Sequence, residues 1–153
     1  MSHHEPPTDE QPSAPNSHRP SLLLLEDDDD MRAMLAEVLR EEGWDITECE
    51  NVFPLIQACI EQKMDDRKCS QPPYDVIVSD NRMPGMSAIK TMQMLHTIRF
   101  GAQIPPTILI TAFGDAETHR LALELGAAAV LDKPFDTKEL ISKVREFAPR
   151  HGP

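Results

Sequence analysis

The chain alternates short segments that pattern as strands with longer segments that pattern as helices. Four of the five strand segments are apolar runs with little polar alternation, which is typical of strands buried on both faces of a parallel sheet. The predicted strands are residues 22–25, 44–49, 76–78 with Asp80 at the end, 107–110 and 127–131. Because strands alternate with helices, we predict an α/β fold with a five-stranded parallel sheet and helices on both of its faces.

Apolar residues at helical spacing predict five helices between these strands. The first four span residues 31 to about 43, 52 to about 64, 87 to about 99, and 115 to 125, and the fifth follows a cap at Thr137. The spacing counts Met34 and Leu123 among the apolar residues of the first and fourth helices. Asn51 is a possible cap of the second helix, and carboxylates at 28–30 can cap the first.

Length and local composition predict a single domain with polar tails. The 153 residues are enough for one packed core. Residues 1–20 are rich in proline and polar side chains, so we expect a disordered tail, followed by a domain at 21–148 and a short tail at 149–153. A polar stretch at 65–73, which ends in two prolines, predicts a surface loop of unusual length.

Charge and cysteine content narrow the classes of function. The formal net charge of -11 argues against nucleic acid and anionic membranes as partners. No apolar run is long enough for a membrane span, and no secretion signal is evident, so we expect a soluble cytoplasmic protein. Cys49, Cys59 and Cys69 form no C-x-x-C pair, which favours free thiols over disulfides or a zinc site.

Charged and hydroxyl side chains stand where the predicted strands end. Glu26 and Asp27 follow the first strand, Asp80 the third, Thr111 the fourth and Lys133 the fifth. Parallel strands bring their carboxyl ends to one edge of the sheet, which is where ligands bind. Each residue also has an ordinary structural interpretation: the acidic pair as helix caps, Asp80 as a turn residue, Thr111 as a strand hydroxyl, and Lys133 as a solvated charge.

If the first and third strands are neighbours, as in the flavodoxin-like order 2-1-3-4-5, the three carboxylates converge. Mutual repulsion would then favour a hard divalent cation with oxygen ligands, and Mg²⁺, or Mn²⁺ in its place, suits an open site that keeps water. A hydroxyl and an ammonium group beside the metal predict a site for a phosphoryl group on Asp80.

Four motifs in this order, LLLLEDDDDMR, VIVSDNRMPGM, ILITAFGD and LDKPFD, resemble the receiver domain of two-component response regulators. The resemblance implies that Asp80 is the phosphoacceptor, and that Thr111 and Lys133 contact the phosphoryl oxygens. It further implies that Asp27 binds the metal directly, Glu26 through water, and Arg82 through its main-chain carbonyl. The bond between Lys133 and Pro134 is expected to be cis.

Three features depart from the resembled family. Val130 stands where an aromatic switch residue is usual, Ala88 stands where glycine is common, and residues 65–73 look like an insertion. Val130 is too short to swap between two positions. We therefore expect either that a signal from Thr111 travels through the backbone toward Gly114, with Phe113 as a candidate switch element, or that phosphorylation shifts the equilibrium between the two states only weakly.

The resemblance implies a response regulator that accepts a phosphoryl group from a histidine kinase or a phosphotransfer protein and acts on an unknown downstream protein. It is expected to be a substrate of phosphotransfer rather than an enzyme, and a monomer or a phosphorylation-dependent dimer. The residues around Asp80 and Thr111 resemble receivers of nitrogen-regulation-type activators, yet no output domain follows, so a stand-alone receiver is expected. The alternatives are a pseudo-receiver that only binds a partner, and a phosphatase of the haloacid dehalogenase type.

Overall fold

The computed structural model describes residues 19–64, 73–98, 104–112 and 115–148. Its elements, in chain order, are β1 (Ser21–Leu25), α1 (Asp29–Glu41), β2 (Asp45–Cys49), α2 (Phe53–Met64), β3 (Val76–Asp80), α3 (Ala88–Ile98), β4 (Thr107–Ala112), α4 (Ala116–Glu124), β5 (Ala129–Lys133) and α5 (Thr137–Arg145). All strand pairs are parallel, and the sheet order is β2-β1-β3-β4-β5. The predicted fold is confirmed.

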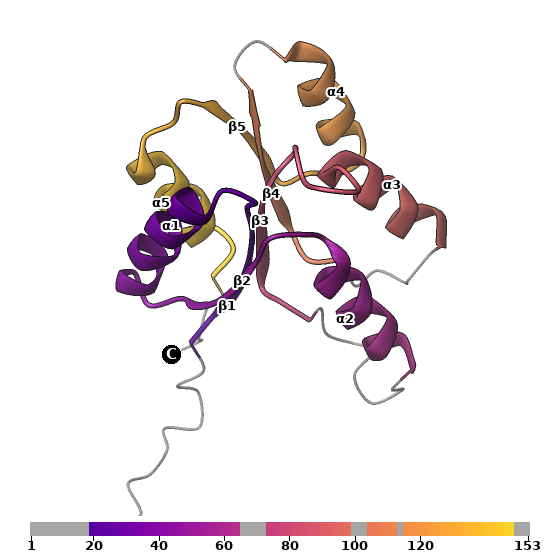
Figure 1. Cartoon of the computed structure of the whole chain (residues 1–153), viewed down its shortest axis with the longest axis horizontal. Helices are drawn as coiled ribbons and strands as arrows, with labels where there is room; N and C mark the ends of the chain where they lie inside the picture. Colours follow the sequence, from indigo (N-terminus) through magenta and orange to yellow (C-terminus); the bar gives the residue numbers. More distant parts are fainter. Residues whose placement is uncertain (1–18, 65–72, 99–103, 113–114, 149–153) are drawn as a thin grey trace, which may run out of the picture.

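Helices cover both faces of the sheet: α1 and α5 lie on one side, and α2, α3 and α4 lie on the other (Figure 1). The interior strand β1 shows why its sequence has no polar alternation. Leu22 and Leu24 belong to the core cluster under α1 and α5, whereas Leu23 and Leu25 belong to the cluster on the opposite face. Successive side chains of a strand point to opposite faces, so both sets are buried here.

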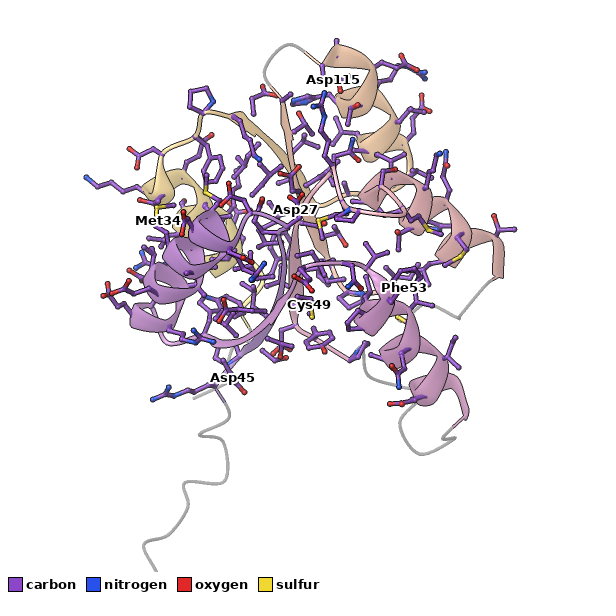
Figure 2. All side chains as sticks on the ribbon, in the orientation of Figure 1. Asp27, Met34, Asp45, Cys49, Phe53 and Asp115 are labelled. Atoms are coloured by element: carbon purple, nitrogen blue, oxygen red, sulfur yellow. The ribbon has the colours of Figure 1, made fainter. Side chains whose placement is uncertain are left out.

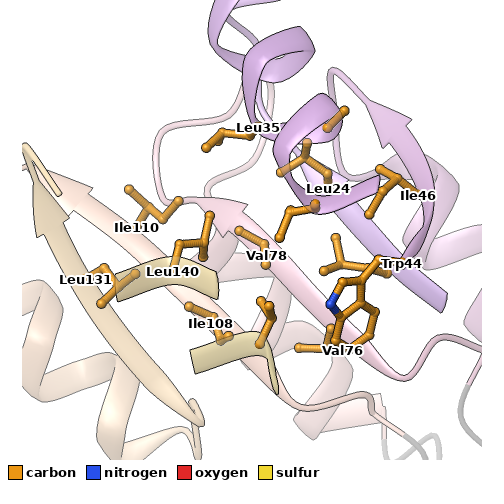
Figure 3. Close-up of a cluster of buried hydrophobic side chains, with 14 residues drawn as sticks. Leu24, Leu35, Trp44, Ile46, Val76, Val78, Ile108, Ile110, Leu131 and Leu140 are labelled. Atoms are coloured by element: carbon orange, nitrogen blue, oxygen red, sulfur yellow. The ribbon is translucent and has the colours of Figure 1, made fainter. Parts of the chain in front are cut away.

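The larger core cluster fills the space between the sheet and the α1–α5 pair (Figure 3). Leu35 and Leu39 come from α1, Leu140 and Val144 come from α5, and Trp44 packs beside them just before β2. Burial of a side chain of this size contributes about 1.5–3 kcal/mol. The helical spacing seen in the sequence therefore marks the faces of α1 and α5 that hold them on the sheet.

Acidic and amide side chains cap the N-termini of several helices. These caps correct two of the predicted helix starts. Asp28 caps α1 by accepting from the amide of Met31 (3.0 Å), so the helix begins at Asp29 rather than at residue 31. Asn51 accepts from the amide at the start of α2 (3.0 Å). Asp136, and not Thr137, caps α5 by accepting from the amide of Lys138 (2.9 Å).

Strand bounds differ from the prediction at β4 and β5. The predicted fifth strand at 127–131 starts too early, because the amide of Ala127 donates to Ala122 (2.9 Å) and continues the end of α4. β4 runs two residues further than predicted, so Thr111 lies inside the strand, paired in register with Asp132 of β5. This extension places the two side chains next to each other at the carboxyl edge.

Two residues assigned to apolar helix faces are exposed instead. Met34 of α1 is 43% exposed and Leu123 of α4 is 58% exposed, and Figure 2 shows the Met34 side chain at the outer surface of α1. Helical spacing alone does not separate a buried position from the margin of a helix face. The predicted loop at 65–73 and both predicted tails fall almost entirely outside the described residues.

Candidate functional site

Three carboxylates meet at the carboxyl edge of the sheet. Glu26 and Asp27 directly follow β1, and Asp80 ends β3. The two strands are paired, with Leu25 opposite Ser79 in register. One oxygen from each of the three carboxylates lies within 4.8 Å of the others. The sequence-predicted acidic cluster is therefore brought together, with Glu26 and Asp80 buried and Asp27 exposed.

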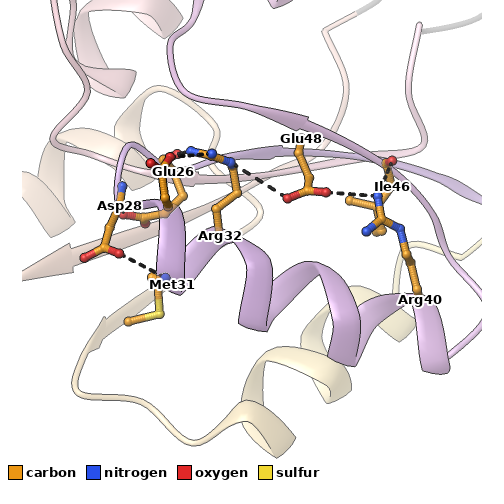
Figure 4. Close-up of polar contacts among 8 residues, drawn as sticks. Glu26, Asp28, Met31, Arg32, Arg40, Ile46 and Glu48 are labelled. Atoms are coloured by element: carbon orange, nitrogen blue, oxygen red, sulfur yellow. Dashed lines mark hydrogen bonds and ion pairs between the residues drawn. The ribbon is translucent and has the colours of Figure 1, made fainter.

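Glu26 is buried without enough partners for its charge. Its Oε1 accepts from the amide of Asp28 (3.2 Å), whereas Oε2 has no hydrogen-bond partner within the described residues. The neighbouring guanidinium of Arg32 donates to the main-chain oxygen of Glu26 (2.8 Å) and not to its carboxylate (Figure 4). Burial, followed by the negative charge of Asp80, raises the pKa of Glu26 to about 7.

This donor set fits a hard divalent cation. A buried carboxylate oxygen without a partner is costly, and three carboxylates in close contact repel one another. Mg²⁺ takes oxygen ligands, binds through one or two carboxylates and keeps several waters, and the exposed position of Asp27 leaves room for water. The chemistry of the residues therefore agrees with the magnesium site expected from the sequence.

Asp80 is held from two sides. Its Oδ1 accepts from the amide of Arg82 (2.9 Å), and its Oδ2 accepts from Nζ of Lys133. Burial alone would lower the pKa of Lys133, but the hydrogen bond to Asp80 and the surrounding negative charges outweigh it and raise that pKa. The ammonium group of Lys133 is thus kept charged beside Asp80. The bond from Lys133 to Pro134 is cis.

Thr111 lies at the same edge, but its hydroxyl is turned to other partners. The side chain is buried, and Oγ1 lies within hydrogen-bonding distance of the main-chain oxygen of Ala112 (3.2 Å) and of Oδ1 of Asp132 (3.3 Å). Val130 is half-buried against the cluster formed by α3 and α4. Phe113, the candidate switch element, lies outside the described residues.

A side-chain pair that sequence reasoning missed stands next to Thr111. His119 of α4 and Asp132 of β5 contact each other through Nε2 and Oδ1 (2.6 Å). No sequence signal marks this pair, since one residue sits on a polar helix face and the other directly precedes the more prominent Lys133. Only the packing of α4 against β5 brings them together.

Two of the three cysteines lie in the described part of the chain. Cys49 and Cys59 are free, and burial raises the pKa of both thiols, which favours the protonated form over the thiolate. Cys69 lies outside the described residues.

Within the described ranges, none of the helices combines the length and the apolar character needed to cross a membrane.

Comparison with known proteins gives a consistent answer. The family model described as the response regulator receiver domain matches residues 22–145. The transcriptional regulatory protein FixJ of Azorhizobium caulinodans is 34% identical over 122 residues, which cover 80% of this chain and 52% of that protein. The C4-dicarboxylate transport transcriptional regulatory protein DctD of Pseudomonas aeruginosa is 31% identical over 88% of this chain and 26% of its own length.

Solved structures with the same fold agree. The Francisella response regulator 1452 receiver domain matches with a TM-score of 0.65 and 26% identity, over 84% of this chain and 95% of that one. A putative response regulator from Chloroflexus aurantiacus matches with a TM-score of 0.69 and 24% identity, over 85% and 98% of the two chains. The chain spans about half the length, or less, of the curated relatives named above. This chain belongs to the response regulator receiver domain family, as shown by the matched family model together with the fold and the side chains that converge at the carboxyl edge of the sheet.

Proposed function

We propose that this chain accepts a phosphoryl group on Asp80 from a phosphohistidine of a kinase or phosphotransfer protein, in a Mg²⁺-dependent reaction. The observation that carries the proposal is the set of groups around Asp80: two further carboxylates close by, and the ammonium group of Lys133 paired with it. A carboxylate in this setting has a cation site and a fixed positive charge ready for an anionic reactant.

Glu26, Asp27 and Asp80 would hold Mg²⁺ or Mn²⁺, with the main-chain carbonyl of Arg82 as a further ligand. When bound, the metal offsets negative charge on the carboxylates and on the incoming phosphoryl group. Asp80 supplies the carboxylate oxygen that bonds to phosphorus while the bond from phosphorus to the donor histidine nitrogen breaks. Lys133 remains beside Asp80 to pair with the phosphoryl oxygens, and Thr111 donates its hydroxyl to them.

In this proposal the chain is a substrate of phosphotransfer and not an enzyme acting on other molecules; at most it loses its own phosphoryl group to water. The signal passes to a downstream protein in the cytoplasm through surface contacts that depend on phosphorylation, as a monomer or a phosphorylation-dependent dimer. Two relatives are named as transcriptional regulatory proteins, so the target is a component of gene regulation or of a pathway that leads to it. Nucleic acid and membrane are not proposed as direct partners of this acidic chain.

Acetyl phosphate with Mg²⁺ tests the proposal. Intact-mass spectrometry is expected to show one added phosphoryl group on the wild type and none on Asp80→Asn. Excess chelator should abolish the modification. Asp45→Asn is the matched control, because Asp45 is an exposed carboxylate at the start of β2, away from the site. Equal modification of the wild type and Asp80→Asn would contradict the assignment.

The second candidate, a pseudo-receiver that only binds a partner, predicts a different outcome. A folded wild-type protein that acquires no phosphoryl group from acetyl phosphate or from a phosphohistidine donor would favour it. The presence of Asp80, Lys133 and both acidic neighbours at one edge argues against this candidate. The phosphatase alternative loses its support because the chain belongs to the receiver family.

A further inference from the structure

His119 and Asp132 connect helix α4 to the end of strand β5. Their contact is short, 2.6 Å from Nε2 to Oδ1, and both side chains are partly buried, at 31% and 38% exposure. Asp132 is an acceptor when ionised, so Nε2 of His119 must carry the proton in this contact. This pair links α4 directly to β5. It lies beside the proposed phosphorylation site.

The same oxygen of Asp132 also accepts a hydrogen bond from the hydroxyl of Thr111. Oγ1 lies 3.3 Å from Oδ1, and the two residues are paired in register across β4 and β5. An ionised carboxylate cannot donate, so Thr111 is the donor. The hydroxyl has one proton, and its recorded acceptors, Asp132 and the main-chain oxygen of Ala112, are both distinct from Asp80.

The other charged groups near His119 do not take the place of Asp132 as its hydrogen-bond acceptor. Asp115, which caps α4, has one oxygen bonded to the amide of Thr118 (3.0 Å) and the other to its hydroxyl (2.5 Å). Arg82 carries a positive charge that acts on Asp115 and cannot accept a hydrogen bond. His119 lies in the first half of α4, so a change in its contact acts on the end of the helix nearest the site.

From these contacts we propose that Asp132 and His119 form a latch that positions Thr111 in the unphosphorylated protein and transmits its release to α4. The inference rests on the proposed function, in which Thr111 donates to a phosphoryl group on Asp80. The hydroxyl proton that now lies near Asp132 and the Ala112 carbonyl would be donated to the phosphoryl group instead, so phosphorylation removes the Thr111 hydrogen bond from Asp132. The His119–Asp132 pair then loses its contact with Thr111 and rearranges. This rearrangement changes the contact between α4 and β5. This route needs no aromatic side chain at Val130.

A double-mutant cycle tests the latch with beryllofluoride, which mimics a phosphoryl group on a carboxylate, in the presence of Mg²⁺. The apparent affinity is measured for the wild type, Asp132→Asn, Thr111→Val and the double variant. Asp132→Asn is expected to tighten binding about threefold or more beyond its effect in the Thr111→Val background. The loss of negative charge near an anion acts equally in both backgrounds, so only release of Thr111 produces the difference. Equal effects in both backgrounds would overturn the latch.

Histidine side-chain NMR supplies the second measurement. Beryllofluoride is expected to shift the ring signals of His119 in the wild type, and the shift should be lost in Thr111→Val and in Asp132→Asn. His96 is the internal control, because its ring contacts the main-chain oxygen of Leu125 (2.7 Å) beyond the opposite end of α4. Shifts near Asp80 without a shift at His119 would refute the latch alone. A protein in which no signal near Asp80 responds would refute the proposed function and the latch with it.

Discussion

Lys133 and Asp80 join the ends of two strands that are not neighbours in the sheet. Asp80 ends β3, Lys133 ends β5, and β4 lies between them. The ammonium group donates to Oδ2 of Asp80, and the carboxylates of Glu26 and Asp27 lie close to that of Asp80. This single positive charge therefore offsets part of the repulsion that the three carboxylates impose on the metal-free protein.

Lys133→Met should lower the free energy of unfolding of the metal-free protein by about 1–3 kcal/mol, because Asp80 stays buried and loses its ion partner. Urea unfolding in the presence of a chelator measures the change. Lys143→Met is the control, since its 4.0 Å contact with Glu146 is exposed and should contribute less than about 0.5 kcal/mol. If both variants lose the same stability, Lys133 does not offset the acidic cluster.

The stability of the metal-free protein should fall as the pH rises from about 4.5 to about 7. Glu26 has a pKa of about 7 in the folded protein against 4.5 ordinarily. The folded state therefore binds the proton more tightly, and its advantage is lost as the carboxyl ionises in place. Glu26→Gln removes this titration, so its stability should decline less than that of the wild type over the interval.

The difference between the two proteins is expected to reach about 1–3 kcal/mol at about pH 8. Urea unfolding of both proteins across this pH range, with chelator present, provides the measurement. The comparison cancels the other titrating groups, because they are common to both. Parallel curves for the wild type and Glu26→Gln would show that Glu26 ionises normally in the fold.

Mg²⁺ should stabilise the wild type, and chelator should reverse the effect. At a hundred times the dissociation constant, the gain expected from binding to the folded state alone is about 2.7 kcal/mol. Asp27→Asn should lose most of this gain. Asp45→Asn should keep it: both aspartates are exposed, but they lie at opposite ends of the sheet (Figure 2). Thermal unfolding of the three proteins with and without Mg²⁺ decides the matter, and an unchanged response in Asp27→Asn would exclude that residue as a ligand.

The sequence by itself determined the fold class and most of the residues at the site edge. Apolar runs such as residues 22–25 can only be buried on both faces, and that requirement leads to a parallel sheet covered by helices. In such a sheet a charged residue at a strand end, such as Asp80, must lie at the carboxyl edge. The four motifs added the identity of the family.

Tertiary structure alone decided the bounds of β5, the state of Glu26 and the partner of Thr111. The three alanines at 127–129 carry no pattern that marks the start of a strand, so the hydrogen bond from Ala127 to the end of α4 sets where the strand begins. The raised pKa of Glu26 depends on burial and on Asp80, which is distant along the chain. The contacts of Asp132 with Thr111 and His119 arise where β4, β5 and α4 meet. Local sequence patterns encode which face of an element is buried, whereas these properties depend on which side chains packing brings within hydrogen-bonding distance.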